Sequence, residues 1–399
     1  MRLHEPCHHF IHEISGSVDP DQLEIACQGL VQRHEILRTI FQQHNSTWVQ
    51  VVLKQLELQL VRHEAQCKSL SVVKELCAAD DIRIPPVNCS PVVQFSYIRG
   101  PGQISYLIIR LSHALYDGSS WRILYRDLEH LYGNLPLGDP VSYSKYIQQW
   151  AKVQADSEAL DFWRDHLDGF QMSHIGDTTN SHAVKPMQPH TVAVGKTIPG
   201  FEPPVNITQA TVGKAAWALT LARFSDTPND ITFGLTTSGR NFDPLATSEI
   251  FGHCINQVPV RVRLDSDSTV LGLMQSIQHQ YAESMEFELV EFRNMVPGDT
   301  DPEPVFGSVL TFQNTRGRVS PLQLGTATGS WIRPTSTPNV NRRSVGVELV
   351  PIENELEVFV AAPNTIWTPE RANEVHRVLC DLIPLLAKNA HLSLRDVGF

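Results

Sequence analysis

Residues 103–121 read QISYLIIRLSHALYDGSSW, and this stretch decides how the rest of the chain is interpreted. Residues 106–111 form a short aliphatic and aromatic run, which is typical of a buried strand. From Trp121 to Leu131, apolar residues recur at helical spacing. The candidate functional residues lie between these elements and are small or polar: Ser112, His113, Asp117, Gly118, Ser119 and Ser120. They lie at a strand-to-helix junction, where a rigid scaffold can hold a reactive side chain.

The junction holds one group that exchanges protons near neutral pH, the imidazole of His113. Asp117 follows four residues later, where its carboxylate can fix a neighbouring backbone or an arginine. Gly118 allows the backbone a conformation that other residues avoid. A purely structural interpretation is also open, in which His113 caps the strand and Asp117 N-caps a helix starting near Ser119. An isolated HxxxD recurs by accident, whereas SHALYDGSSW after a buried strand is much less accidental.

Bulk properties limit the function classes. A chain of 399 residues with 42% apolar residues predicts two domains with ample cores. The net charge of −11 argues against a nucleic-acid binder. No 18-residue apolar run or signal peptide is present, so no membrane association is expected. The seven cysteines form no CxxC pair and predict free thiols in a reducing compartment, the cytoplasm. The histidines near the N-terminus lack a matching zinc pattern, so no metal is predicted.

The periodicity predicts two halves of mixed strands and helices, divided by a polar stretch. We place an N-terminal lobe at 1–168, a linker at 169–190 and a C-terminal lobe at 191–399. In the first lobe we expect strands at 10–18, 48–60 (two), 92–97 and 104–111, and helices starting at Asp19-Pro20 and at 69–79, 121–131, 143–155 and 157–167. In the second we expect strands at 191–198, 230–237, 256–264, 306–312, 344–351 and 355–361, and helices at 208–224, 270–287 and 369–386. Pattern alone therefore predicts two α+β lobes.

The SHALYDGSSW stretch resembles the HHxxxDG core motif of condensation domains of nonribosomal peptide synthetases. With Ser112 in place of the first histidine and Ser120 three residues after Asp117, it resembles the SHxxxDxxS/T variant of fungal terminal condensation-like domains, which release peptides by cyclisation. Three further stretches agree in order along nearly the whole chain. They are RHEILRTIF at 33–41, GRNFDPLATSEIFGHCINQVPVRV at 239–262 with Gly252, Asn256, Pro259 and Arg261 in the family's pattern, and FQN at 312–314.

The resemblance implies a fold and a reaction. The fold is α+β, with two lobes similar to chloramphenicol acetyltransferase arranged as a V-shaped pseudo-dimer with a central tunnel, and His113 at its middle. The reaction joins an amine to an acyl or peptidyl thioester, with cyclising release as one form. His113 either accepts the amine proton or only orients the amine. Gly118 is expected to donate its N–H to the developing oxyanion.

The resemblance also implies roles for residues around this centre. Asp117 is expected to be structural and paired with an arginine, Arg240 first, with Arg33 or Arg38 as the second choice. Arg33 and Arg38 would brace the active-site loop from inside. Three residues are predicted to bind substrate: Ser112, Ser120 and Asn256. An alternative for Asn256 is a strand-start residue in a turn.

The implied partner is a peptidyl carrier domain, with other synthetase modules if the chain is part of a larger protein. The chain itself is expected to be a monomer with no directly bound cofactor, because the phosphopantetheine arm belongs to the carrier. Two other functions remain open. One is an HxxxD acyltransferase using a coenzyme A thioester, although the DFGWG segment of the plant-type group is not found. The other is a catalytically silent condensation-like docking module, against which the intact His113 and Asp117 argue.

Overall fold

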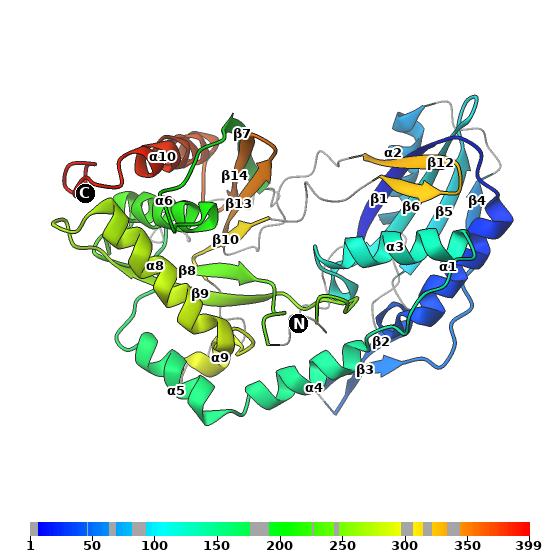
Figure 1. Cartoon of the computed structure of the whole chain (residues 1–399), viewed down its shortest axis with the longest axis horizontal. Helices are drawn as coiled ribbons and strands as arrows, with labels where there is room; N and C mark the ends of the chain where they lie inside the picture. The colour runs from blue at the N-terminus through cyan, green and yellow to red at the C-terminus, as the bar shows by residue number, and fades with distance from the viewer. Residues whose placement is uncertain are drawn as a thin grey trace. The chain divides into compact units, whose positions relative to one another are not determined.

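The computed structural model describes residues 7–45, 47–63, 69–81, 93–175, 191–225, 227–242, 247–296, 306–313, 321–332 and 344–399 (Figure 1). Contacts divide the chain into two compact units. Unit 1 contains Met1–Gln148, Asp243–Cys254 and Val319–Thr335, and unit 2 contains Gln149–Phe242, Ile255–Arg318 and Ser336–Phe399. Each unit has its own sheet and helices, so the α+β class predicted from the sequence is confirmed for both.

Unit 1 is built on a six-stranded sheet with the order β11-β12-β1-β6-β5-β4. These strands are β1 (Cys7–Ser15), β4 (Val61–His63), β5 (Val93–Arg99), β6 (Ile104–Ser112), β11 (Leu322–Leu324) and β12 (Ala327–Ile332). The β5–β6 hairpin is the one predicted around 100–102. Antiparallel pairing of β1 with β6 places Cys7 opposite Ser112, which brings the start of β1 beside His113.

Unit 1 also contains the helices α1 (Pro20–Arg33), α2 (Leu70–Asp81) and α3 (Ser120–Tyr132). A separate two-stranded sheet, β2 (Thr39–His44) and β3 (Thr47–Val52), follows α1 in the sequence. Asp19 caps α1 through its side chain, and Pro20 occupies the first turn, as Asp-Pro predicts. Helix α3 buries Ile123, Leu124 and Leu128 at helical spacing and packs against α1. The short 3₁₀ turn η2 (His113–Leu115) joins β6 to the loop before α3.

Two strands of this sheet come from late in the sequence and were not predicted. Figure 1 shows β12, coloured orange, beside the blue β1, and the pairing runs from Ile11 opposite Ile332 to Ser15 opposite Thr328. Residues 243–254 also belong to unit 1, whereas α5 (Ser157–His166), predicted in the first lobe, belongs to unit 2. The predicted division at 168 is corrected accordingly. Most of the predicted linker, 176–190, lies outside the described residues.

Unit 2 contains a second six-stranded sheet with the order β7-β14-β13-β10-β8-β9. Its strands are β7 (Thr191–Pro199), β8 (Asp230–Thr237), β9 (Asn256–Arg263), β10 (Ser308–Phe312), β13 (Val345–Ile352) and β14 (Glu355–Pro363), and its longer helices are α6 (Gln209–Phe224), α8 (Val270–Ser284) and α10 (Pro369–Lys388), with the short α9 (Phe292–Met295). Helix α6 is buried almost all round and holds Trp217 in the centre of the core. Thr208 caps it by accepting a hydrogen bond from Thr211 N at 3.1 Å, as predicted.

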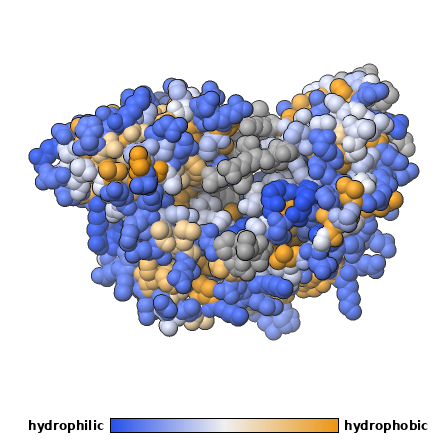
Figure 2. All heavy atoms as spheres, viewed as in Figure 1, coloured by the Kyte–Doolittle hydropathy of each residue, from blue (hydrophilic) through white to orange (hydrophobic). Residues whose placement is uncertain are grey.

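The surface is mixed in polarity. Figure 2 shows hydrophilic residues over most of one face, with hydrophobic residues scattered among them. Of the exposed large hydrophobic side chains, Val205 at 86% and Ile25 at 64% are the most accessible. Single exposed apolar residues of this kind are normal on protein surfaces. None of the described helices is long and apolar enough to cross a membrane.

Candidate active site

His113 lies at the end of β6, as the first residue of η2, and its side chain is half-buried. Ser112 caps this turn, because its Oγ accepts a hydrogen bond from Ala114 N at 3.3 Å. The His113 ring places Nδ1 3.2 Å from the carbonyl oxygen of Tyr116. A carbonyl only accepts hydrogen bonds, so this contact requires the proton on Nδ1. The lone pair is then on Nε2, the nitrogen that can accept a proton.

Aromatic rings enclose the His113 imidazole on several sides. Tyr116 stacks against it with ring centroids 4.9 Å apart and planes 12° apart, while His8 and His253 approach edge-on at 5.5 Å each. The Tyr116 hydroxyl lies 2.6 Å from His8 Nδ1. Burial lowers the pKa of His8 to about 4, and His113 and His9 add to the effect. His8 is therefore uncharged at neutral pH.

Asp117 is buried and ties the loop to the start of α3. Its Oδ1 accepts hydrogen bonds from Ser119 N at 3.0 Å and Ser120 N at 3.1 Å, the two residues at which α3 begins. Its Oδ2 accepts a hydrogen bond from Cys254 N at 3.0 Å. Asp117 thus joins two segments of unit 1 that are more than 130 residues apart. The predicted partner, Arg240, belongs to unit 2, where it is buried, and this pairing stays a prediction.

Gly118 is exposed in the turn that follows Asp117, where Asp117 O accepts a hydrogen bond from Ser120 N at 3.1 Å. Its φ angle is not in the left-handed region, so the expected need for an unusual backbone conformation is wrong. The neighbouring amides of Ser119 and Ser120 are occupied by Asp117. Within the described part of the chain, the Gly118 N–H has no acceptor. It is the amide of this turn that can still donate.

The two serines predicted to bind substrate have structural roles instead. Ser120 is 1% exposed, and its Oγ lies within hydrogen-bonding distance of Asp117 and of both N and O of Gly252. A hydroxyl with these partners has no capacity left for a ligand. Ser112 is 2% exposed and caps η2. We therefore correct both predictions: burial makes these side chains parts of the scaffold.

We call residues 247–254 the return segment, because they follow β8 of unit 2 in the sequence but belong to unit 1. Tyr143 OH donates to His253 O and Tyr146 OH donates to Cys254 O, each at 2.7 Å. Gly252 is required here, since a Cβ would lie 2.2 Å from Cδ2 of Tyr143. The return segment is therefore seated closely against α4 (Tyr143–Val153) and the start of α3.

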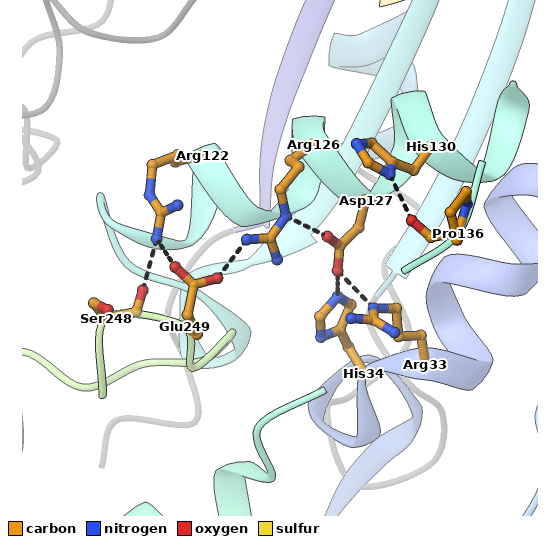
Figure 3. Close-up of polar contacts among 9 residues, drawn as sticks. All are labelled: Arg33, His34, Arg122, Arg126, Asp127, His130, Pro136, Ser248 and Glu249. Carbon is orange, nitrogen blue, oxygen red and sulfur yellow. Dashed lines mark hydrogen bonds and ion pairs between the residues drawn. The ribbon is translucent and has the colours of Figure 1, made fainter. Parts of the chain in front are cut away.

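A second buried aspartate, Asp127, holds the far part of α3 (Figure 3). Its side chain is fully buried and accepts hydrogen bonds from Arg33 Nε at 2.7 Å, His34 Nε2 at 2.9 Å and Arg126 Nε at 2.8 Å. Burial alone would raise the pKa of this carboxyl, but the bonds from His34, Arg126 and Arg33 outweigh it and hold the pKa well below the ordinary 3.8. Figure 3 also shows Glu249 of the return segment facing the same helix, bound to Arg122 and Arg126.

Arg33 and Arg38, for which a supporting role is predicted, contact different parts of unit 1. Arg33 binds Asp127 of α3, and Arg38 Nη1 donates to the carbonyl of Leu53. Within the described residues neither arginine forms a hydrogen bond or ion pair with 113–119. They contact the helix and the β3 region, and their predicted support of the active-site loop stays a prediction.

Asn256 lies at the start of β9 in unit 2, and its amide is already engaged. Nδ2 donates to Glu288 O at 2.7 Å and to Val290 O at 2.8 Å, which uses both of its hydrogens. The predicted role of Asn256 as a donor to substrate is therefore corrected, because its amide links β9 to residues 288–290. Arg261 of the same motif binds Asp230 through Nε and Nη2 and the Asp168 carbonyl through Nη1, so it is structural as well.

Four residues of this region were not predicted from the sequence: Tyr116, His253, Asp127 and Glu249. Tyr116 and His253 lie within the motif stretches 112–121 and 239–262, but their contacts depend on residues that are distant in the sequence. Asp127 reads as an ordinary polar residue in RDLEH on a helix, and no local signal marks it as buried.

The amino-acid sequence of the chain is similar to those of known proteins. The family model described as Condensation domain matches residues 7–398. The nonribosomal peptide synthetase benY of Aspergillus terreus is 29% identical over 98% of this chain and 36% of its own length. SidD of Aspergillus fumigatus is 34% identical over 70% of this chain and 13% of its own length. The bassianolide nonribosomal cyclodepsipeptide synthetase of Beauveria bassiana is 32% identical over 76% and 10%. The chain thus spans 36% or less of these relatives.

Solved structures agree with the sequence comparison. The crystal structure of holo T3CT aligns with a TM-score of 0.85 and 28% identity, covering 98% of this chain and 89% of that one. The complex of the X-domain and OxyB from teicoplanin biosynthesis aligns with a TM-score of 0.78 at 18% identity, which shows the shared fold alone. These likenesses confirm the predicted two-lobed fold class. The V-shaped arrangement and the tunnel stay predictions.

Proposed function

Because the chain belongs to the condensation domain family of nonribosomal peptide synthetases, we propose that it joins an amine nucleophile to an acyl or peptidyl thioester on the phosphopantetheine arm of a carrier domain. The observation that carries this proposal is the His113 ring, whose Nδ1 is held by the Tyr116 carbonyl. Such a ring presents an unprotonated Nε2 beside a turn with an unoccupied amide. The proposed partner is a peptidyl carrier domain, together with the modules of a larger synthetase.

In the proposed reaction the amine nitrogen attacks the thioester carbonyl. The C–N bond forms, the tetrahedral intermediate collapses, and the C–S bond breaks to release the pantetheine thiolate. The proton lost by the amine goes to Nε2 of His113, which can then return it to the departing sulfur. General base catalysis of this kind contributes roughly 10²- to 10⁴-fold. Alignment of two tethered reactants supplies much of the remainder.

The developing oxyanion is assigned to the Gly118 N–H. This amide is exposed, and Asp117 occupies the two that follow it in the turn. A fixed backbone donor stabilises the negative charge where it forms, at no cost of reorganisation during the reaction. The lack of a side chain at 118 also lets a substrate approach the backbone closely.

We further propose that the acceptor amine belongs to the same peptidyl chain, so that the product leaves as a ring. Two observations support this finer assignment. The SHxxxDxxS spacing of Ser112, His113, Asp117 and Ser120 resembles the fungal terminal form. One relative is by name a cyclodepsipeptide synthetase. The serines themselves are scaffold residues, so they mark the subtype and take no part in the ring closure.

The test uses the full chain and a holo carrier domain loaded with a series of linear peptides of different length and N-terminal residue. Intact-protein mass spectrometry follows loss of the peptide from the carrier, and small-molecule mass spectrometry reads the product. We expect cyclic product with the wild type and a rate roughly 10²- to 10⁴-fold lower with His113→Ala. His279→Ala is the matched control, since this histidine is 74% exposed on α8, and it should keep the wild-type rate.

Other results would redirect the assignment. Turnover of the same acyl groups from coenzyme A but not from the carrier would favour the coenzyme A acyltransferase. Binding of the loaded carrier without any product in either case would favour the docking module. Product formation by His113→Ala at the wild-type rate would remove the catalytic role of that residue.

A further inference from the structure

His253 touches the backbone of the active-site turn at two points. Its Nδ1 lies 3.0 Å from the carbonyl oxygen of His113 and 3.3 Å from that of Tyr116. Both partners are carbonyls, so this nitrogen must carry a proton and share it between them. One N–H therefore bridges the two ends of the turn that carries the candidate base.

The Tyr116 carbonyl is the point where two imidazoles meet. It accepts from His113 Nδ1 at 3.2 Å and from His253 Nδ1 at 3.3 Å. Both distances are at the long end for N–H···O bonds, so neither contact alone fixes the carbonyl strongly. Its direction sets the orientation and tautomer of the His113 ring, and the direction depends on both donors.

His253 is itself held firmly by its neighbours. Cys254 N donates to the Asp117 carboxylate, and Tyr143 OH donates to His253 O. On the other side, Gly252 contacts Ser120 Oγ through its backbone. The return segment therefore presents the His253 ring to the turn in a fixed position, as a supporting group for a functional side chain requires.

We propose that His253 is a positioning residue for His113, with its Nδ1–H locking the turn so that His113 Nε2 remains the unprotonated nitrogen facing the reacting amine. What the oriented ring then does rests on the proposed function. The contact also gives Asp117 a second task. By holding Cys254, it keeps the register between the return segment and the turn, and so it acts on His113 through His253.

The test compares His253→Asn with His253→Gln in the full-length chain. The Asn Nδ2 occupies nearly the place of His Nδ1 and can donate to the same two carbonyls, whereas Gln carries its amide one methylene farther out. The readout is the ¹⁵N spectrum of histidine-labelled protein, with the His113 signals identified by their loss in His113→Gln. We expect wild type and His253→Asn to show a protonated Nδ1 and a bare Nε2 at His113. His253→Gln should show shifts averaged between the two tautomers.

Turnover of the carrier-bound thioester provides a second readout. We expect kcat to fall about 10- to 100-fold in His253→Gln with KM little changed, since displacement of a reacting group by about 1 Å has effects of this size. His253→Asn should restore most of kcat. A structural role without positioning would lower the melting temperature of both variants and leave the His113 tautomer unchanged.

The inference is overturned if His253→Gln keeps the wild-type His113 shifts, or if Asn and Gln behave alike. It is also overturned by the wild-type spectrum alone if His253 carries its proton on Nε2, a result that depends on no variant folding. The spectra need no thioester. Absence of product from the wild type would therefore count against the proposed function while leaving the tautomer result to decide the role of His253.

Discussion

Two buried aspartates ten residues apart, Asp117 and Asp127, contact different kinds of donor. Among the donors to Asp117 are the backbone N–H groups of Ser119, Ser120 and Cys254 and the short hydroxyl of Ser120. Asp127 accepts hydrogen bonds from three cationic or ionisable side chains, those of Arg33, His34 and Arg126. Backbone donors have fixed positions, so the first arrangement determines geometry. Long cationic side chains adapt, so the second arrangement provides mainly charge compensation.

The difference matches what each aspartate lies beside. Asp117 is next to the turn that carries His113, where small displacements change the chemistry. Asp127 lies within α3, beside the end of α1, and there the requirement is to hold two helices together. The return segment contacts both places, through Cys254 at Asp117 and through Glu249 at Arg126. The return segment therefore links the turn held by Asp117 to the charged cluster around Asp127.

The largest expected effect comes from removing the charge at Asp127. Asp127→Ala should destabilise unit 1 by about 3–5 kcal/mol. The reason is that Arg33 and His34 stay buried but lose the carboxylate that pairs with them. Asp127→Asn keeps the shape and some hydrogen bonds and should cost less. Urea unfolding at pH 7 measures both. Asp161→Ala is the matched control, since that aspartate is 67% exposed in a surface pair and its removal should cost less than about 1 kcal/mol. Equal costs for Asp127→Ala and Asp161→Ala would contradict the charge-compensation interpretation.

A smaller effect is expected from crowding the return segment at Gly252, close to Asp117. Gly252→Ala places a methyl group 2.2 Å from Cδ2 of Tyr143, which must force the return segment or the ring to move. Overpacking of this kind costs about 1–3 kcal/mol, measured by the same unfolding experiment. Gly138→Ala is the control, because nothing lies within 4 Å of the added atom. Shrinking Tyr143 in the double variant should recover part of the loss, and strictly additive losses would show that the two residues do not clash.

The two units also show how far the sequence predicts the molecule. The strand at 230–237, the hairpin at 93–112 and the Thr208 cap were predicted because each has a local signature of period, turn or cap. His113 was placed at a strand-to-helix junction for the same reason. Such features depend on neighbours a few residues apart, which a single sequence displays.

The remaining features depend on distant partners. Pairing of β12 with β1 and the return of 247–254 to unit 1 leave no period in the sequence, because their partners are more than 100 residues away. The substrate roles expected of Ser120 and Asn256 failed for a related reason. Their residue types suggest hydrogen bonding, but only the fold reveals that Gly252, Glu288 and Val290 already use that capacity.

The smallest expected effect comes from Arg122, the exposed member of the charged cluster on α3. Arg122 is 57% exposed and binds Glu249 at 2.6 Å and the Ser248 carbonyl at 2.9 Å. Arg122→Ala should cost about 0.2–1 kcal/mol, because water already solvates both charges and the pair pays side-chain entropy to form. The loss should shrink between low salt and 1 M salt, where screening acts within about 3 Å. Arg377→Ala, from a pair 3.8 Å apart with both side chains about 70% exposed, should change nothing measurable. A loss at Arg122 as large as that at Asp127, or one that salt leaves untouched, would mean that Glu249 belongs to the buried network and that burial does not separate the two ends of the helix.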